Sequence, residues 1–230
     1  MKKIILFLFM LSAGLNAQQN HDPYKLLERV KQKFSTVNDY EVNAHIKVDV
    51  SFLKVPDMDA KIYFKKPDKL KMDSEGFAML PKQAFNFSPD RLLSGNYSAI
   101  YVKQENIGNT PLEVIKVIPN DENSEIVLST LWIEPGKNVI RKIESVPRKG
   151  GSFEISFNYS SNLNYPLPSS IEFYFDVPNM PRGMNGPGGS RQQPKAKGSK
   201  PERGSVSIAY SNYKVNKGIP DSIFSEKKNK

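Results

Sequence analysis

Apolar and polar residues alternate without a break from Tyr40 to Val50. The apolar positions are Tyr40, Val42, Ala44, Ile46, Val48 and Val50, and the polar positions between them are Glu41, Asn43, His45, Lys47 and Asp49. Successive side chains of a β-strand point to opposite faces, so the pattern predicts a strand with one buried and one wet face. Strands of this kind are typical of antiparallel sheets.

The same alternation recurs along the chain, and turn sequences such as Glu134-Pro135-Gly136-Lys137 separate the segments. We expect further strands at residues 58–64, 70–72, 97–103, 112–118, 125–134, 139–146, 153–159, 170–177 and 205–213. These strands do not alternate with helices, which excludes doubly wound α/β folds. The sequence therefore predicts a mainly β fold of about ten antiparallel strands, and a sheet of this size must close or curl.

Three segments are expected to cover the sheet. Asp22 and Pro23 are typical of a helix start, and Leu26, Leu27, Val30 and Phe34 follow at helical spacing, which predicts an amphipathic helix from Pro23 to about Thr36. Residues 77–95 break the strand pattern and are expected to form two short helical or irregular pieces over the sheet. Residues 219–224 are expected to be a second cover segment.

The net charge of +9 lies outside the predicted fold. Lys2 and Lys3 carry two of the positive charges, residues 179–204 carry a net +5 and the tail at residues 226–230 a net +2. The remaining residues sum to zero. Nucleic-acid binding needs a basic face on a scaffold, so the basic composition does not indicate a DNA- or RNA-binding protein.

Residues 1–17 have the pattern of a cleavable secretory signal. Two lysines precede an unbroken apolar run from Ile4 to Leu11, and small residues lead to Ala17. The run is too short for a membrane-spanning helix, which needs about 20 residues. We expect export to the periplasm with a cut after Ala17; a buried strand or a retained anchor is the alternative. Zero Cys residues exclude disulfide scaffolds, thiolate metal sites and cysteine nucleophiles.

Residues 179–204 interrupt the single domain predicted for residues 18–225. The segment has six Gly and four Pro in 26 residues and too few apolar side chains to bury, so we expect a disordered loop. It could be a solubilising insert, or it could bind an anionic surface. The candidate residues for the second role are Arg182, Arg191, Lys195, Lys197, Lys200 and Arg203.

The apolar strand faces could form an ordinary packed core or line a lipid cavity. The candidate cavity residues are Val42, Ala44, Ile46, Met58, Ala60, Ile62, Phe64, Met72, Phe153, Ile155, Phe157, Ile171, Phe173, Phe175, Val206 and Ile208. Burying an acyl chain releases about 0.8 kcal/mol per methylene and needs no special motif. Pattern alone therefore does not separate the two interpretations.

The order of several weak motifs resembles the LolA-like superfamily of outer-membrane lipoprotein-sorting proteins. The motifs are the Phe34/Tyr40 junction, the turn at residues 66–70, residues 132–136 before a "VIRKI" strand, and the closing "YKVNKGIPDSIF". The resemblance implies a curved antiparallel half-barrel closed by helices around an apolar cavity for lipoprotein acyl chains or lipid. It also implies a role as periplasmic carrier, with an acceptor protein or the envelope membrane surface as further partners.

A sensor or interaction module with the same fold but no transport is the alternative, and a hydrolase is a third possibility. In the family a strand arginine matters for passing the cargo on, and the first two strands here contain lysines in its place. The sequence has two histidines, His21 and His45, but it has no GxSxG motif and no metal-ligand spacing. We therefore expect a monomeric, non-enzymatic protein without cofactor or metal.

Deleting residues 179–204 is expected to leave folding intact, because the loop buries no core. The deletion should weaken binding to anionic vesicles at low salt, where each Lys or Arg near the surface contributes about 1 kcal/mol. Circular dichroism checks the first expectation, and vesicle sedimentation checks the second. Unchanged vesicle binding would leave the solubilising interpretation.

Overall fold

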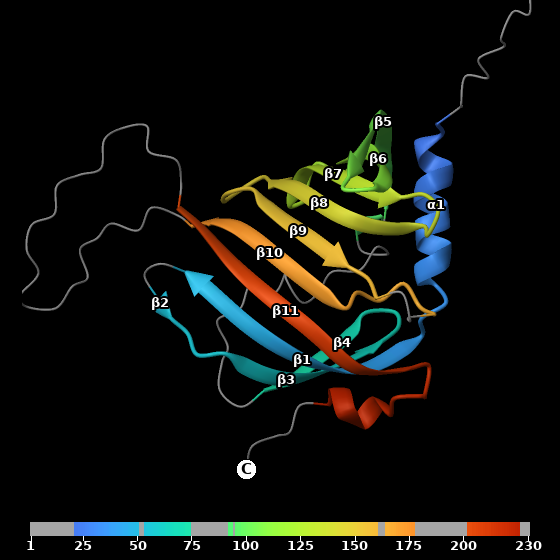
Figure 1. Cartoon of the computed structure of the whole chain (residues 1–230). Helices are drawn as coiled ribbons and strands as arrows, with labels where there is room; N and C mark the ends of the chain where they lie inside the picture. The colour runs from blue at the N-terminus through green and yellow to red at the C-terminus, as the bar shows by residue number, and fades with distance from the viewer. Residues whose placement is uncertain are drawn as a thin grey trace, which may run out of the picture.

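A computed structural model describes residues 21–50, 53–74, 92–93, 95–160, 164–177 and 202–225. Figure 1 shows a curved sheet with helix α1 beside it. The elements are α1 (Pro23–Phe34), β1 (Asp39–Val50), β2 (Leu53–Lys54), β3 (Met58–Lys65), β4 (Lys69–Ser74), β5 (Tyr97–Ile107), β6 (Thr110–Pro119), β7 (Ile126–Glu134), β8 (Val139–Pro147), β9 (Phe153–Asn158), β10 (Ser170–Val177), β11 (Glu202–Val215) and the 3-10 helix η1 (Asp221–Phe224).

All strands pair antiparallel in a single sheet with the order β4-β3-β1-β11-β10-β9-β8-β7-β6-β5, and the short β2 pairs β1. From β5 to β11 each strand lies beside the next one in the sequence. The exception is β1, which lies between β3 and the last strand, β11. The sheet curves but β4 and β5 remain edges, so the predicted antiparallel half-barrel is confirmed (Figure 1).

Helix α1 lies against the inner face of the sheet, the face that carries the core. Asp22 caps it, because its Oδ1 accepts hydrogen bonds from Tyr24 N at 3.0 Å and Lys25 N at 3.2 Å. The predicted apolar stripe is buried: Leu26, Leu27 and Val30 pack in the main core cluster with the strands, and Phe34 packs in a second cluster with Phe64. Two polar contacts fix its position: Ala99 N of β5 donates to Tyr24 Oη, and Arg29 Nε donates to Asn138 Oδ1. Among the described residues, no helix is long and apolar enough to cross a membrane.

The period-two pattern places the core residues opposite one another. In the β1–β3 pair, Val42 faces Ile62 and Ala44 faces Ala60, and in the β1–β11 pair Ile46 faces Ile208. These side chains are between 0% and 7% exposed. The wet face carries cross-strand ion pairs instead, since Lys61 and Lys214 both lie 3.0 Å from Glu41 Oε1. One face is therefore apolar and the other is charged but neutralised.

The structure corrects one boundary of the predicted loop. Strand β11 begins at Glu202, so residues 202–204 belong to the sheet, where Arg203 pairs with Asp176 and Gly204 with Phe175. A Cβ at position 204 would lie 2.7 Å from Phe175 Cζ, which explains a glycine inside the strand. The Arg203 guanidinium lies 3.8 Å from Glu154 and 3.9 Å from Asp176. Arg203 is therefore a sheet residue, and the deletion proposed above must end at residue 201.

The expected cover segment at residues 219–224 also differs. It forms η1, which contacts the edge strand β4 and has no buried residue, and only the preceding Ile219 is buried. Lys65 and Lys69 hold it through Asp221, at 2.7 and 3.1 Å. It is fastened to the edge of the sheet and does not cover the inner face.

Several other predictions lie outside the described residues. They concern the signal segment, the basic tail, five of the six basic candidate residues and most of residues 77–95. Of the last segment, Leu93 is described; it is 1% exposed and packs in the main core.

Asn216 connects the end of β11 to the start of β1. Its Oδ1 accepts hydrogen bonds from Asn38 N at 2.7 Å and Asp39 N at 3.4 Å, and its Nδ2 donates to Thr36 O at 2.8 Å. The buried Asp39 carboxylate in turn accepts from Lys217 N and Gly218 N. Asn216 has φ 56°, a backbone conformation that Asn tolerates better than most residues. These contacts form the Asn216–Asp39 clamp.

Asn216→Ala is expected to lower the free energy of unfolding by about 2 kcal/mol, because three hydrogen bonds of about 0.5–1.5 kcal/mol each are lost or left unmade. Urea unfolding measures the change. Asn212→Ala is the matched control, because Asn212 also has a positive φ of 58° but no side-chain hydrogen bond within the described part of the chain. Equal losses for the two variants would contradict the clamp, because they would assign the whole effect to backbone strain.

Candidate functional site

Most of the candidate cavity residues are packed in the core. Val42, Ala44, Ile46, Met58, Ala60, Ile62, Phe64, Ile155, Phe157, Ile171, Phe173, Val206 and Ile208 are at most 9% exposed. Met72, Phe153 and Phe175 are partly buried against the same cluster. Two of the candidates, Phe157 and Ile171, also line a pocket.

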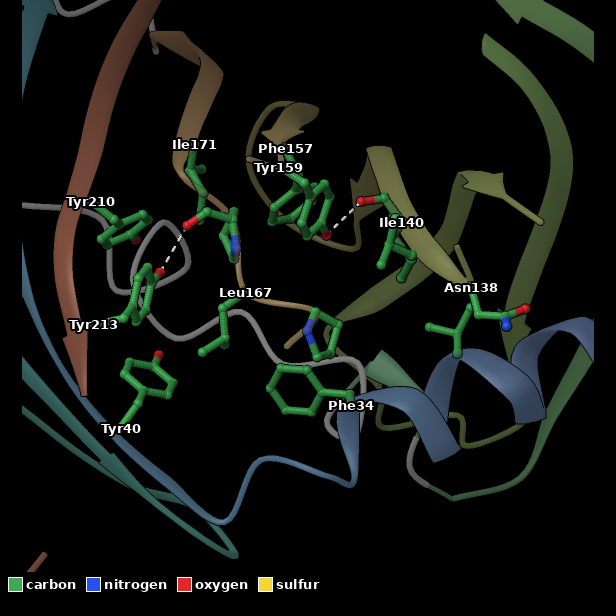
Figure 2. A pocket seen from close by; sticks show the side chains of 14 residues that line it. Phe34, Tyr40, Asn138, Ile140, Phe157, Tyr159, Leu167, Ile171, Tyr210 and Tyr213 are labelled. Atoms are coloured by element: carbon green, nitrogen blue, oxygen red, sulfur yellow. Dashed lines mark hydrogen bonds between the residues drawn. The ribbon is translucent and has the colours of Figure 1, made fainter. Parts of the chain in front are cut away.

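The pocket has a volume of about 50 Å³ and lies where the end of α1 meets the sheet (Figure 2). Helix α1 contributes Val30 and Phe34, and the β7–β8 turn contributes Asn138. The connection from β9 to β10 supplies Tyr159 and residues 166–168. The described residues that line it are Val30, Phe34, Tyr40, Asn138, Val139, Ile140, Phe157, Tyr159, Pro166, Leu167, Pro168, Ile171, Tyr210 and Tyr213.

Four tyrosines give the pocket polar groups within an apolar wall; Tyr40, Tyr159, Tyr210 and Tyr213 are called the pocket tyrosines. Tyr159 Oη donates to Ile140 O at 2.9 Å, and Tyr213 Oη donates to Pro168 O at 2.8 Å (Figure 2). The hydroxyls of Tyr40 and Tyr210 have no hydrogen-bond partner among the described residues, yet neither is sealed from solvent. They are therefore free to bond a ligand.

Burial raises the pKa of each pocket tyrosine above its ordinary value of about 10. For Tyr159, the nearby Arg141 partly opposes the increase in pKa, while Glu134 adds to it. The four hydroxyls therefore stay neutral over the physiological pH range. They can donate or accept a hydrogen bond, but they bring no charge into the pocket.

A more open hollow of about 300 Å³ adjoins the pocket. We call it the basic hollow; its lining is Lys33, Gly136, Lys137, Asn138, Val139, Tyr159, Ser160, Asn164, Tyr165 and Pro166. Four of these residues, Asn138, Val139, Tyr159 and Pro166, also line the pocket. The two spaces are therefore adjacent, and the hollow has the more polar lining.

The β7–β8 turn shapes the wall between them. Lys137 N donates to Glu134 O at 3.2 Å, and Asn138 adopts a left-handed φ of 53°. The partly buried Glu134 carboxylate lies 2.7 Å from Arg141 and 3.0 Å from Lys137. The Arg141 guanidinium also lies 5.3 Å from the centre of the Tyr159 ring. A cation–carboxylate group therefore holds the turn against the pocket.

Sequence reasoning missed the pocket tyrosines as site residues. Tyr210 and Tyr213 are three residues apart, so a regular strand would place them on opposite faces. A β-bulge removes this difference, because the pairing shifts from Asn43↔Ser211 to Glu41↔Lys214 and leaves Asn212 and Tyr213 both opposite one residue of β1. An Asn between the two tyrosines was the available signal.

Each of the two histidines lies beside an acidic side chain, and His21 Nδ1 is 3.4 Å from Glu113 Oε1. His45 Nδ1 lies 2.8 Å from its cross-strand partner Asp59, and Nε2 lies 3.4 Å from Asp57, on the exposed face. The hydrogen bond to Asp59 is the main cause that raises the pKa of His45. His21 stacks on Tyr101 at 4.4 Å. In the described part of the chain, no cluster of three or more His, Cys, Asp or Glu residues could hold a metal.

Replacing Tyr40 and Tyr210 together by Phe is expected to leave the free energy of unfolding at neutral pH nearly unchanged, because neither hydroxyl has a described partner. Tyr213→Phe, the matched control, should cost about 1 kcal/mol through its lost hydrogen bond. Folding raises the tyrosine pKa values. The contribution of the neutral tyrosines to the free energy of unfolding is therefore fully present below about pH 10 and decreases as the pH rises above it. The double variant should lose less stability than the wild type at about pH 11.

Urea unfolding at both pH values measures these differences. Equal costs at neutral pH for the double variant and Tyr213→Phe would contradict the assignment of the free hydroxyls.

No family model matches the sequence, and no curated protein matches it. Solved structures do match. A LolA superfamily protein from Nitrosomonas europaea is 13% identical with a TM-score of 0.54, and the match covers 89% of this chain and 97% of that chain. A domain classed as an outer membrane lipoprotein-sorting protein from Vibrio parahaemolyticus is 13% identical with a TM-score of 0.56, and the match covers 88% and 97%.

A DUF1329 family protein from Desulfovibrio piger is 12% identical with a TM-score of 0.57, and the match covers 89% of this chain and 98% of that chain. Identities this low establish the shared architecture and leave the activity open. In all three comparisons the match covers nearly the full length of the other structure. The chain therefore has the LolA-like fold, an antiparallel half-barrel with helix α1 against its inner face.

Proposed function

We propose that the protein is an exported, non-enzymatic carrier that binds the acyl chains of a lipid or lipoprotein between α1 and the inner face of the sheet. In this proposal it acts in the periplasm and takes part in outer-membrane lipoprotein sorting. The observation that carries the proposal is the pocket at the junction of α1 and the sheet, which is largely apolar and aromatic and lies beside a more polar hollow. The signal-like residues 1–17 and the fold shared with the Vibrio domain support it.

The volume of the pocket sets a condition on how a lipid enters. A space of about 50 Å³ holds only a few water molecules and not an acyl chain. Binding therefore requires α1, or the connection from β9 to β10, to move away from the sheet. Because the helix is held mainly by apolar contacts, an acyl chain can replace them at about 0.8 kcal/mol per buried methylene.

The unpaired hydroxyls of Tyr40 and Tyr210 fit the same role. An acyl chain in a carrier is attached to an ester, an amide or an acid group, each of which accepts hydrogen bonds. Neutral phenol groups bond such a group without introducing a charge into an apolar site. They also give the site a preference for the polar end of the chain over plain hydrocarbon.

Gentle extraction from the cell envelope followed by native mass spectrometry tests the proposal, and a co-purifying lipid mass is expected. Ile171→Trp should lower bound lipid about tenfold, because the added ring fills the pocket, at a stability cost of about 1–3 kcal/mol. Val146→Trp is the control with similar added bulk, since Val146 is 44% exposed. An apo mass alone, or equal lipid in both variants, would contradict the proposed carrier function.

A further inference from the structure

We propose that the basic hollow binds the anionic head group of the lipid whose acyl chain enters the pocket. The protein would then select lipids with a carboxylate or phosphate head group over uncharged lipids of the same chain length. This inference rests on the proposed lipid-binding function and adds the class of ligand. The shared chemistry is an oxyanion attached to a hydrocarbon chain.

The arrangement of the two spaces fits a ligand with one apolar and one polar end. Tyr159 and Pro166 stand between them, with apolar side chains such as Ile171 on the pocket side and Lys33 and Asn164 on the hollow side. A ligand that fills both must be apolar at one end and polar at the other. The hollow is about six times larger than the pocket and more exposed, as a head group in contact with water requires.

The described charged residues that line the hollow are positive. Lys33 and Lys137 line the hollow, and none of the described residues that line it is acidic. Lys33 has no ion-pair partner within the described part of the chain. The Glu134 carboxylate at the start of the same turn is already engaged by Arg141 through one oxygen and by Lys137 through the other. Cations therefore exceed carboxylates around the hollow, which attracts an anion.

The side-chain amide of Asn138 is a neutral hydrogen-bond donor at the border of the two spaces. The Oδ1 atom of Asn138 accepts a hydrogen bond from Arg29 Nε at 3.2 Å, so the amide is oriented and its Nδ2 group remains to donate. Asn138 lines both spaces and is held in the turn by its left-handed backbone. An oxyanion at the border of pocket and hollow would thus meet a donor as well as positive charge.

Binding of palmitate, palmitoyl lysophosphatidate and monopalmitoylglycerol, measured by isothermal titration calorimetry at low salt, tests the inference. The three probes share one acyl chain and carry a carboxylate, a phosphate and no charge. The double variant Lys33→Gln/Lys137→Gln should bind the anionic probes about two- to tenfold more weakly, because exposed ion pairs contribute modestly. It should bind monopalmitoylglycerol as the wild type does.

The control double variant Lys25→Gln/Lys149→Gln removes the same charge away from the hollow, at the start of α1 and in the β8–β9 turn. It should bind all three probes as the wild type does. A loss shared by both double variants would overturn the inference in favour of general charge attraction. Equal wild-type affinity for charged and uncharged probes would also overturn it while leaving lipid binding intact.

Binding of none of the probes by any variant would instead count against the carrier function itself. Weakened binding of the phosphate probe alone, or of the carboxylate probe alone, would support the inference and identify the head group.

Discussion

The pairing of the first strand with the last one holds the two parts of the sheet together. Strand β1 is the neighbour of both β3 and β11, so among the described strands the β1–β11 ladder is what joins the β3–β4 hairpin to β5–β11. The Asn216–Asp39 clamp closes the end of this ladder, between residues 178 positions apart. The sheet can therefore be completed only when nearly the whole chain is present, which makes this a fold dominated by non-local contacts.

The candidate site lies at the same end of the ladder. The chain leaves α1 at Phe34 and enters β1 through Val37, which is fully buried with Phe64 and Leu167. Tyr40 and Tyr213 lie one on each strand of the β1–β11 pair, with ring centroids 5.8 Å apart. A movement of α1 that opens the pocket must bend the chain at this junction. The clamp does not restrain α1 itself, since its hydrogen bonds extend toward the helix only as far as Thr36, two residues after the end of α1.

Periodicity predicted the strands and the helix, because it follows directly from which face of each element is buried. It did not predict the pairing of β1 with β11, which leaves no local signal. It left open whether Ile62 and Phe173 line a cavity or a packed core, because an apolar face is compatible with a ligand or with protein; in this structure protein covers both side chains. The pocket tyrosines were missed for a different reason: the bulge at Asn212 changes the face that Tyr213 occupies. The sequence-predicted strand 205–213 also began three residues late, because Gly204 looks like a loop residue although Phe175 needs its space.

The uneven distribution of charge over the surface explains why the net charge of the sequence did not predict the basic hollow. The body of the chain is neutral, yet its charges are not evenly paired. On the wet face of β1 and β3, Lys47 lies 3.2 Å from Asp57, and His45 meets both Asp57 and Asp59. At the β7–β8 turn a single carboxylate, Glu134, is shared between Arg141 and Lys137, and Lys33 is left over. The excess of cations at the hollow is therefore balanced by carboxylates elsewhere on the surface. Exposed charges more than about 10 Å apart are screened from each other, so a ligand experiences the local excess and not the neutral total.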